Sequence, residues 1–286
     1  MTFVQCLQKY MFMIKLIGNQ QFRVLTGNIH VFSIIIVYSY LLMCSRSLSA
    51  QQPYTATHID SLALEKVIVE EYYTSNLTDY ADTSGGILPK DSRTYRIYID
   101  MMPDYSLQLV YGDKKHDLLI NTTTRFFNNK ECAALTGFNI DAKKINNNTV
   151  ALDSWLTLGA ASRLHTGILK SEDADGSWLT RPAFKNADGL TKGNLPTFKV
   201  YNLDLNFFNN DSTAAKFSAN NGGWAALGGV KGPTSENRVL IAQLTTNGKL
   251  SFRINIQIGT PTGGSLKFVA KNPEGMEIKF NGLEYN

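Results

Sequence analysis

Strict alternation of apolar and polar residues near the C-terminus is the feature that most constrains the fold of this chain. From residue 250 to residue 258 the apolar Leu250, Phe252, Ile254, Ile256 and Ile258 alternate with Ser251, Arg253, Asn255 and Gln257. Because successive side chains of a β-strand point to opposite faces, the pattern predicts a strand. Asn247-Gly248 precedes it, and this pair favours a type I′ turn. We therefore expect a hairpin that joins residues 238–246 to residues 250–258.

A second alternating segment lies nearer the N-terminus. In "TYRIYIDM" one face carries Tyr95, Ile97, Ile99 and Met101, and the other carries Arg96, Tyr98 and Asp100. The short sequence "MPD" follows, and then "YSLQLVYG" continues the alternation. Two strand-like runs separated by a short turn sequence predict another hairpin.

The fold class follows from the number of such segments. Weaker strand patterns fill much of the remaining chain, and clusters such as "TSGG", "GGVKGPTSEN" and "PTGG" separate them. Many strands joined by turn-forming clusters are typical of an all-β fold, so we expect a β-sandwich or a jelly-roll-like fold with antiparallel hairpins and little helix. No Pro/Ser-rich linker interrupts the chain, which favours one domain over residues 51–286, and any seam would fall near residues 176–196.

The first fifty residues differ from the rest and predict a targeting segment. They contain four basic residues and no acidic one, and their apolar centre from Val31 to Met43 is thirteen residues long. A transmembrane helix needs about 20 apolar residues. The basic start, the short apolar centre and the small residues that follow are typical of a secretory signal peptide over residues 1–50. A lipoprotein cleaved before Cys44 and an uncleaved signal anchor are the alternatives.

Charge and cysteine content narrow the function further. The whole chain has 28 basic and 24 acidic residues, and four of the basic ones lie in the leader, so the remainder carries 24 of each. This neutral balance favours neither nucleic acid nor an acidic membrane surface as a partner. Cys132 is the single cysteine after residue 50, so an intrachain disulfide is impossible there and the hydrophobic core must hold the fold.

The order of several motifs resembles that of a known family. "TYRIYIDMMPDYSLQLVYG", "TTTRFFNN", "LDSWLTLG", "KSEDADGS" and "NRVLIAQLTTNGKLSF" occur in this order, and together they resemble an uncharacterised family of secreted proteins of Bacteroidota. Members often end in a type IX secretion sorting domain, whereas this chain stops at "GLEYN". The resemblance implies export, to the periplasm or to the cell surface and beyond, and it implies no activity.

The acidic run "KSEDADGSW" suggests a metal site. Asp173, Asp175 and Ser177 stand two residues apart, so their oxygens could surround one calcium ion, and Gly176 permits a tight backbone turn. The run does not match an EF-hand, and a calcium ion takes six to eight oxygen ligands. Calcium is therefore a possible cofactor only if the fold adds further ligands, for which Glu172, Asp188 and Asp153 are candidates.

The tryptophans suggest a ligand surface. Trp155 lies within an alternating apolar pattern and is expected in the core. Trp178 and Trp224 lie beside loop-like sequences, so they are the candidate ligand contacts, with sugars as the ligand class.

No catalytic motif stands out, and three function classes stay open. Glycosidase carboxylates could be found among Asp153, Glu172, Asp173 and Asp175, and His58, His116 and His165 lie in polar, exposed-looking sequence. The favoured class is an exported, non-catalytic protein with a binding, adhesion or structural role, whose partner is a glycan or another surface protein. A carbohydrate-binding module and a secreted hydrolase are the alternatives.

The calcium hypothesis leads to a direct test. Bound calcium would stabilise the folded state, by about 2.7 kcal/mol at a concentration 100 times the dissociation constant. We expect residues 51–286 to melt at a higher temperature in calcium than in chelator. Identical melting temperatures would rule the metal out.

Overall fold

The described part of the chain is built from β-strands. The computed structural model describes residues 60–209 and 215–286, so the predicted signal peptide and His58 lie outside it. All described residues fall within one compact unit. No helix among them is long and apolar enough to cross a membrane. The one α-helix of the described residues is α3 (Leu77–Ala81), which Asn76 caps.

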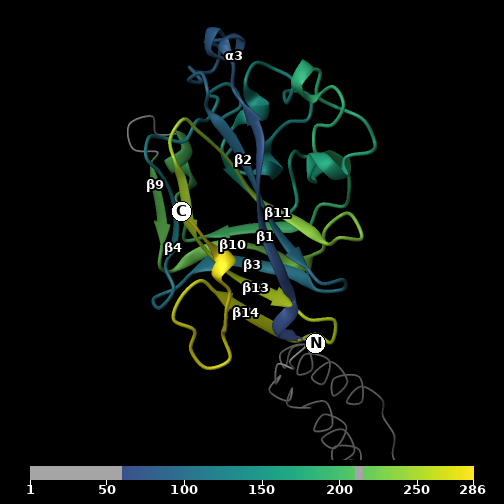
Figure 1. Cartoon of the computed structure of the whole chain (residues 1–286), viewed down its shortest axis with the longest axis vertical. Helices are drawn as coiled ribbons and strands as arrows, with labels where there is room; N and C mark the ends of the chain where they lie inside the picture. The colour runs from purple at the N-terminus through teal and green to yellow at the C-terminus, as the bar shows by residue number, and fades with distance from the viewer. Residues whose placement is uncertain (1–59, 210–214) are drawn as a thin grey trace, which may run out of the picture. The chain divides into compact units, whose positions relative to one another are not determined.

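The strands form three larger sheets and one small ladder (Figure 1). Sheet A has the order β1 (Leu64–Thr74), β2 (Arg93–Met101), β11 (Arg238–Thr246) and β5 (Trp155–Leu156). Sheet B has the order β15 (Ile278–Lys279), β14 (Ser265–Val269), β13 (Asn255–Gly259), β3 (Ser106–Gly112), β10 (Gly222–Val230) and β8 (Thr197–Tyr201). Sheet C has the order β16 (Glu284–Tyr285), β12 (Leu250–Arg253), β4 (Leu118–Thr122) and β9 (Lys216–Ala219), and β6 (His165–Gly167) pairs with β7 (Leu190–Lys192).

Short 3₁₀ turns connect many of these strands. They are η1 (Asp60–Leu62), η2 (Gly137–Asn139), η3 (Val150–Leu152), η4 (Lys170–Glu172), η5 (Pro182–Phe184), η6 (Leu205–Asn209) and η7 (Asn281–Leu283). Strand pairing is antiparallel throughout the described ladders except between β14 and β15. The all-β, sandwich-like fold class predicted from the sequence is therefore confirmed.

The main core lies where the three larger sheets pack together. Ile97 and Ile99 contribute from sheet A, Trp224 and Ile256 from sheet B, and Phe252 from sheet C. The predicted alternation holds here, because Leu250, Phe252, Ile254, Ile256 and Ile258 are all buried. Burying apolar side chains from three sheets in one cluster is what makes the sheets a single unit.

Neither predicted hairpin forms, and the one strand predicted over residues 250–258 is two strands, β12 in sheet C and β13 in sheet B, which divide at Ile254. Strand β2 pairs with β1 and β11, whereas β3 pairs with β10 and β13, so "MPD" connects two sheets. Strand β11 pairs with β2 and β5, and β12 pairs with β4 and β16. Because both edges of each strand are already occupied, β11 and β12 cannot pair with each other.

Asn247-Gly248 is a corner between sheets A and C, and neither residue has the positive φ of a type I′ turn. Gly248 is needed for a different reason, which is close packing. A Cβ added there would lie 2.6 Å from Thr122 Oγ1 and 2.7 Å from the backbone nitrogen of Thr124. The sequence signal was therefore correct about a change of direction and wrong about its geometry.

A layer of loops covers the outer face of sheet A. We call residues 127–192 the loop layer; they contain β5, β6, β7 and η2 to η5 and appear in teal to green at the upper right of Figure 1. A second buried cluster joins this layer to the sheet. Tyr72, Tyr98 and Leu240 of sheet A pack there against Leu152, Leu179, Phe184 and Leu190 of the loop layer, among others.

Arg96 is the polar centre of this second interface. Its side chain is 2% exposed, and its guanidinium carbon lies 3.6 Å above the ring centre of Tyr72. Nε donates a hydrogen bond of 2.9 Å to Oε1 of Gln243, and Nη1 donates one of 2.9 Å to the carbonyl oxygen of Gly189. A buried charge is tolerated only when its donors find acceptors, and the loop backbone supplies one here.

Neighbouring side chains of sheet A also donate hydrogen bonds to backbone carbonyl oxygens of the loop layer. The hydroxyl of Tyr72 donates to the carbonyl oxygen of Asp188 at 2.7 Å, and that of Tyr98 donates to the carbonyl oxygen of Ile168 at 2.7 Å. Nε2 of Gln243 donates to two further carbonyl oxygens of the loop layer. Irregular backbone must satisfy its polar groups before it can be buried. Sheet A provides the donors for the loop layer, so both faces of β2 are buried.

We predict that Arg96→Ala destabilises the protein strongly. The substitution leaves Oε1 of Gln243 and the carbonyl oxygen of Gly189 without their donor inside the interface, and each buried acceptor left unsatisfied costs about 1–3 kcal/mol. Urea denaturation measures the loss. Arg163→Ala is the control, because Arg163 is exposed and surface substitutions usually change stability by no more than about 0.5 kcal/mol. Equal denaturation midpoints for the two variants would contradict the role assigned to Arg96.

Candidate functional site

The acidic run and Asp188 together hold one loop of the layer in place. Asp188 is fully buried. Its Oδ2 accepts hydrogen bonds from the backbone N–H groups of Trp178 and Leu179, and its Oδ1 accepts one of 3.0 Å from the N–H of Leu190. Oδ2 of Asp173 accepts bonds of 2.7 and 2.8 Å from the N–H groups of Asp188 and Gly189. We call Asp173, Ser177 and Asp188 the acidic brace.

The other polar residues of the run also have partners within the loop. Ser177 Oγ donates to the carbonyl oxygen of Leu179 at 2.8 Å and lies 3.1 Å from Oδ2 of Asp188. Oδ2 of Asp175 accepts a bond of 2.8 Å from the hydroxyl of Thr191. Gly176 has a φ of +85°, as expected for a tight turn. The loop is therefore fixed by side-chain bonds at several points.

Among the described residues, Asp188 lies beside the predicted metal ligands, but no set of ligands converges on one point. Of the extra ligands considered, Asp188 contacts the run, whereas Glu172 pairs with Arg238 and Asp153 lies elsewhere in the layer. No group of three or more His, Cys, Asp and Glu residues suited to a metal ion occurs in residues 60–209 and 215–286. Asp173, Asp175 and Ser177 instead bond to the protein itself, and calcium stays a prediction for the melting experiment.

Trp178 is presented on the surface by this braced loop. Its side chain is 39% exposed. The imidazole of His165 packs against the indole ring at a tilt of 45°, with ring centres 4.8 Å apart, and Nζ of Lys192 lies 5.4 Å from the indole ring centre. Its backbone N–H is held by Asp188, so the position of this residue in the loop is fixed.

Trp224 corrects the expectation of a surface formed by two tryptophans. It is fully buried in the main core, and its Nε1 donates a bond of 2.9 Å to the carbonyl oxygen of Thr157. The glycines around it suggested a loop, but Trp224 lies in β10, which has β3 on one side and β8 on the other. It cannot contact a ligand from there. Trp155 is buried as expected.

The expectation of exposed histidines is wrong for His116 and His165, which are 5% and 6% exposed. Nδ1 of His165 lies 2.8 Å from Oγ of Ser162. The same Oγ accepts backbone N–H bonds of 3.2 Å from Leu164 and from His165 itself. Ser162 is fully buried, so this serine–histidine contact is that of a hydrogen-bonded turn before β6.

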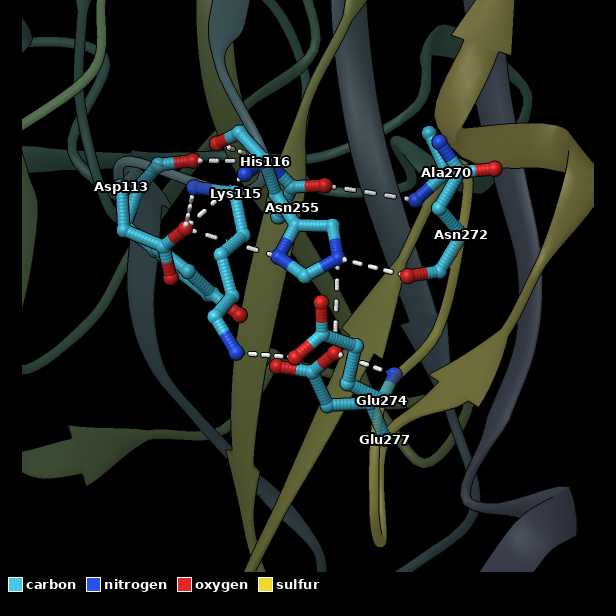
Figure 2. Close-up of polar contacts among 9 residues, drawn as sticks. Asp113, Lys115, His116, Asn255, Ala270, Asn272, Glu274 and Glu277 are labelled. Carbon is cyan, nitrogen blue, oxygen red and sulfur yellow. Dashed lines mark hydrogen bonds and ion pairs between the residues drawn. The ribbon is translucent and has the colours of Figure 1, made fainter.

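His116 lies in a second cluster, which closes one end of sheet B (Figure 2). Its Nδ1 is 3.4 Å from Oδ1 of Asp113, and its Nε2 is 3.0 Å from the carbonyl oxygen of Asn272 and 3.4 Å from Oε2 of Glu277. Partial burial by itself would raise the pKa of Asp113. Hydrogen bonds from the backbone N–H groups of Lys115 and His116 outweigh it and lower the pKa below its ordinary value.

These contacts tie the turn after β3 to the loop after β14. Lys115 and Glu274 form an ion pair across the gap (Figure 2). Asn255, 1% exposed, donates to the carbonyl oxygen of His116 at 3.1 Å and accepts from the N–H of Ala270 at 3.3 Å. The ring of His116 is enclosed by its partners, so the cluster joins the two loops.

The carboxylates considered for glycosidase chemistry have separate partners, since Asp173 and Asp175 bond to residues 188–191 whereas Asp153 and Glu172 bond elsewhere. Asp153 is fully buried and its Oδ1 accepts a bond of 2.6 Å from the N–H of Asn129. Burial raises its pKa well above the ordinary value of an aspartate. Glu172 forms an ion pair with Arg238. Cys132 is half-buried beside the second cluster, and burial raises its pKa. None of these residues lines either groove described next.

Two of the surface grooves in the described part of the chain lie near residues considered above. The larger, of about 430 Å³, is lined by residues of β2, of the corner at 246–250 and of Tyr285, whose ring is stacked on Phe252. The smaller, of about 270 Å³, we call the Thr166 groove. Its lining residues are Gly159, Thr166, Lys192, Gly193, Asn194, Leu195, Pro196, Val230, Lys231, Gly232 and Pro233.

The Thr166 groove and Trp178 are adjacent, because Lys192 belongs to both. An exposed aromatic ring beside a polar groove is a common form of ligand site. Sequence analysis identified Trp178 but missed Thr166 and Lys192, since a threonine and a lysine in short strands carry no distinctive pattern.

Comparison with known proteins identifies no relative. No protein-family model matches the chain, and searches of curated proteins and of solved structures found no match. The resemblance to secreted proteins of Bacteroidota therefore stays a prediction, and the site has to be interpreted from its own geometry.

We predict that His165 makes the protein less stable in mild acid. Burial lowers its pKa below the 6.5 of an exposed histidine, although Asp188 and Asp175 oppose the effect. The unfolded chain then binds a proton at a higher pH than the folded one, so the free energy of unfolding falls as the pH falls below about 6.5. His165→Asn keeps a partner for Ser162 and does not titrate. Urea midpoints between pH 8 and pH 5 should fall less in the variant, and an unchanged slope would contradict the prediction.

Proposed function

We propose that this is an exported, non-catalytic binding protein that holds a saccharide at Trp178 and the Thr166 groove. The observation that carries the proposal is the exposed indole of Trp178 on a loop fixed by Asp173 and Asp188. Large apolar side chains are usually buried, so an indole that a buried and a half-buried carboxylate hold at the surface is a candidate for ligand contact.

The chemistry of the surface suits a sugar. A sugar ring has apolar C–H faces that can stack on an indole and hydroxyl groups that need hydrogen-bond partners. The Thr166 groove begins next to the ring, and its lining includes the polar residues Lys192, Asn194 and Lys231. Its volume of about 270 Å³ lies just below the range of pockets for drug-sized ligands, roughly 300–1,000 Å³. One unit of a longer chain is a better match than a compact ligand.

The rigidity of the site supports binding as its role. The backbone N–H groups of Trp178, Leu179, Asp188 and Gly189 are all held by buried or half-buried carboxylates. A preformed site loses little conformational entropy when a ligand binds. The export predicted from the leader would place the site outside the cytoplasm, where it could contact extracellular polysaccharides.

We predict that Trp178→Ala abolishes most saccharide binding. Affinity electrophoresis through gels that contain laminarin, xylan, alginate or carrageenan should show retardation of the wild-type protein by at least one of them. Loss of the indole should weaken that binding by about tenfold or more, equivalent to about 1.4 kcal/mol.

The control is Tyr80→Ala, which removes a 51% exposed ring on α3 and should leave retardation unchanged. A wild-type protein that no polysaccharide retards, or a Trp178→Ala variant retarded like the wild type, would disprove the proposed function.

A further inference from the structure

The ring of His116 faces groups that accept hydrogen bonds on both of its sides (Figure 2). Nε2 lies 3.0 Å from the carbonyl oxygen of Asn272 and 3.4 Å from Oε2 of Glu277, and Nδ1 lies 3.4 Å from Oδ1 of Asp113. A carbonyl oxygen and an ionised carboxylate only accept hydrogen bonds. The contact with Asn272 therefore places a hydrogen on Nε2, and the carboxylate of Asp113 favours a second hydrogen on Nδ1.

A neutral ring cannot match both sides of the cluster. In neutral imidazole one nitrogen carries a hydrogen and the other carries a lone pair. With the hydrogen on Nε2, the lone pair of Nδ1 points toward the carboxylate of Asp113, and Nδ1 has no hydrogen-bond partner among the described residues. The imidazolium ion carries a hydrogen on each nitrogen, so it matches Asp113 on one side and Asn272 and Glu277 on the other.

The charges around the ring act in the same direction. Burial of His116 opposes a charged ring, whereas a carboxylate within 4 Å on each side favours one. Asp113 is ionised at neutral pH, because its pKa lies below the ordinary value. Other titratable groups also face the cluster, and they are Lys115 and Glu274, which pair with each other, Lys267 of β14 and the buried hydroxyl of Tyr111.

The cluster joins the turn after β3 to residues 270–277, which we call the β14–β15 connection. Residues 271–276 of this connection are exposed. The contacts with His116 hold it to the end of sheet B, together with the ion pair between Lys115 and Glu274. Exposed segments with few buried contacts open at a lower free energy than core strands do. Weaker contacts with His116 would therefore affect the β14–β15 connection first.

We infer that His116 is a pH-dependent switch, whose charged ring fastens the β14–β15 connection to sheet B and whose neutral ring releases it. An imidazole changes its charge between about pH 5 and 8. The stabilisation that the cluster gives is therefore present in mild acid and is lost as the pH rises. The switch is separate from the saccharide site and does not depend on the proposed function.

Hydrogen–deuterium exchange of residues 51–286 tests the inference. Exchange is followed at about pH 5.5 and pH 8, on either side of the charge change of an imidazole, and each rate is corrected for the intrinsic effect of pH. Protection of residues 270–277 should fall about tenfold at the higher pH, because the segment then opens more often. Protection of β2 should stay the same at both.

Variants assign the effect to His116. The amide of His116→Gln can still donate to Asn272 but cannot become charged, so protection of the β14–β15 connection should no longer depend on pH. Glu277→Gln keeps the shape of the side chain and removes its charge, so it should lower the protection at pH 5.5. His165→Asn is the matched control, because His165 is a second buried histidine that lies in the loop layer. It should leave the pH dependence of the connection unchanged.

Nuclear magnetic resonance of the ring nitrogens of His116 reports its charge in the unaltered protein, so the test does not rely on a variant that folds. A ring that gains charge over the pH range in which the connection becomes protected supports the inference. A ring that is neutral at pH 5.5 overturns it. Protection that is equal at both pH values in the wild type, or a pH dependence that persists in His116→Gln, also overturns it.

Discussion

The buried guanidinium of Arg96 is the contact on which the rest of this structure depends. It lies between sheet A and a layer of loops in which regular strands and helices are short. A layer of this kind can be buried only if its carbonyl oxygens find donors, and Arg96, Gln243, Tyr72 and Tyr98 supply them from the sheet. The apolar cluster around Tyr98 and Phe184 then adds the hydrophobic stabilisation.

The candidate site inherits its geometry from this interface. Arg96 and Tyr72 fix the backbone carbonyls of Gly189 and Asp188. The carboxylate of Asp188 in turn holds the backbone of Trp178, and Asp173 holds the backbone of Asp188 and Gly189. A short series of hydrogen bonds thus fixes the backbone of Trp178 relative to the centre of sheet A. This is how a surface without regular secondary structure can be preformed for a ligand.

Sequence alone predicted the strands and their buried positions well, because alternation reports local geometry that any β-sheet imposes. It failed on pairing: Asn247-Gly248 is a sound local signal for a hairpin, but the partners of β11 and β12 were decided by distant strands. Trp224 was misplaced because adjacent glycines look like a loop, whereas here they serve close packing in β10.

Polar residues were the harder part of the prediction. Arg96 in the middle of "TYRIYIDM" was the available signal for the second interface, since a charge in a strand buried on both faces must have a specific partner. The acidic run was recognised as a feature of the sequence. Its hydrogen bonds to Asp188, Gly189 and Thr191 join residues outside the run, and no local sequence pattern predicts which of them meet.

Hydrogen–deuterium exchange of the loop layer tests the central claim most directly. If the carboxylates of Asp173 and Asp188 brace the loop, the amides of Trp178, Leu179, Asp188 and Gly189 are protected, and they exchange on the timescale of the amides within sheet A. Exchange of these four amides within seconds, as in an open surface loop, would contradict the account.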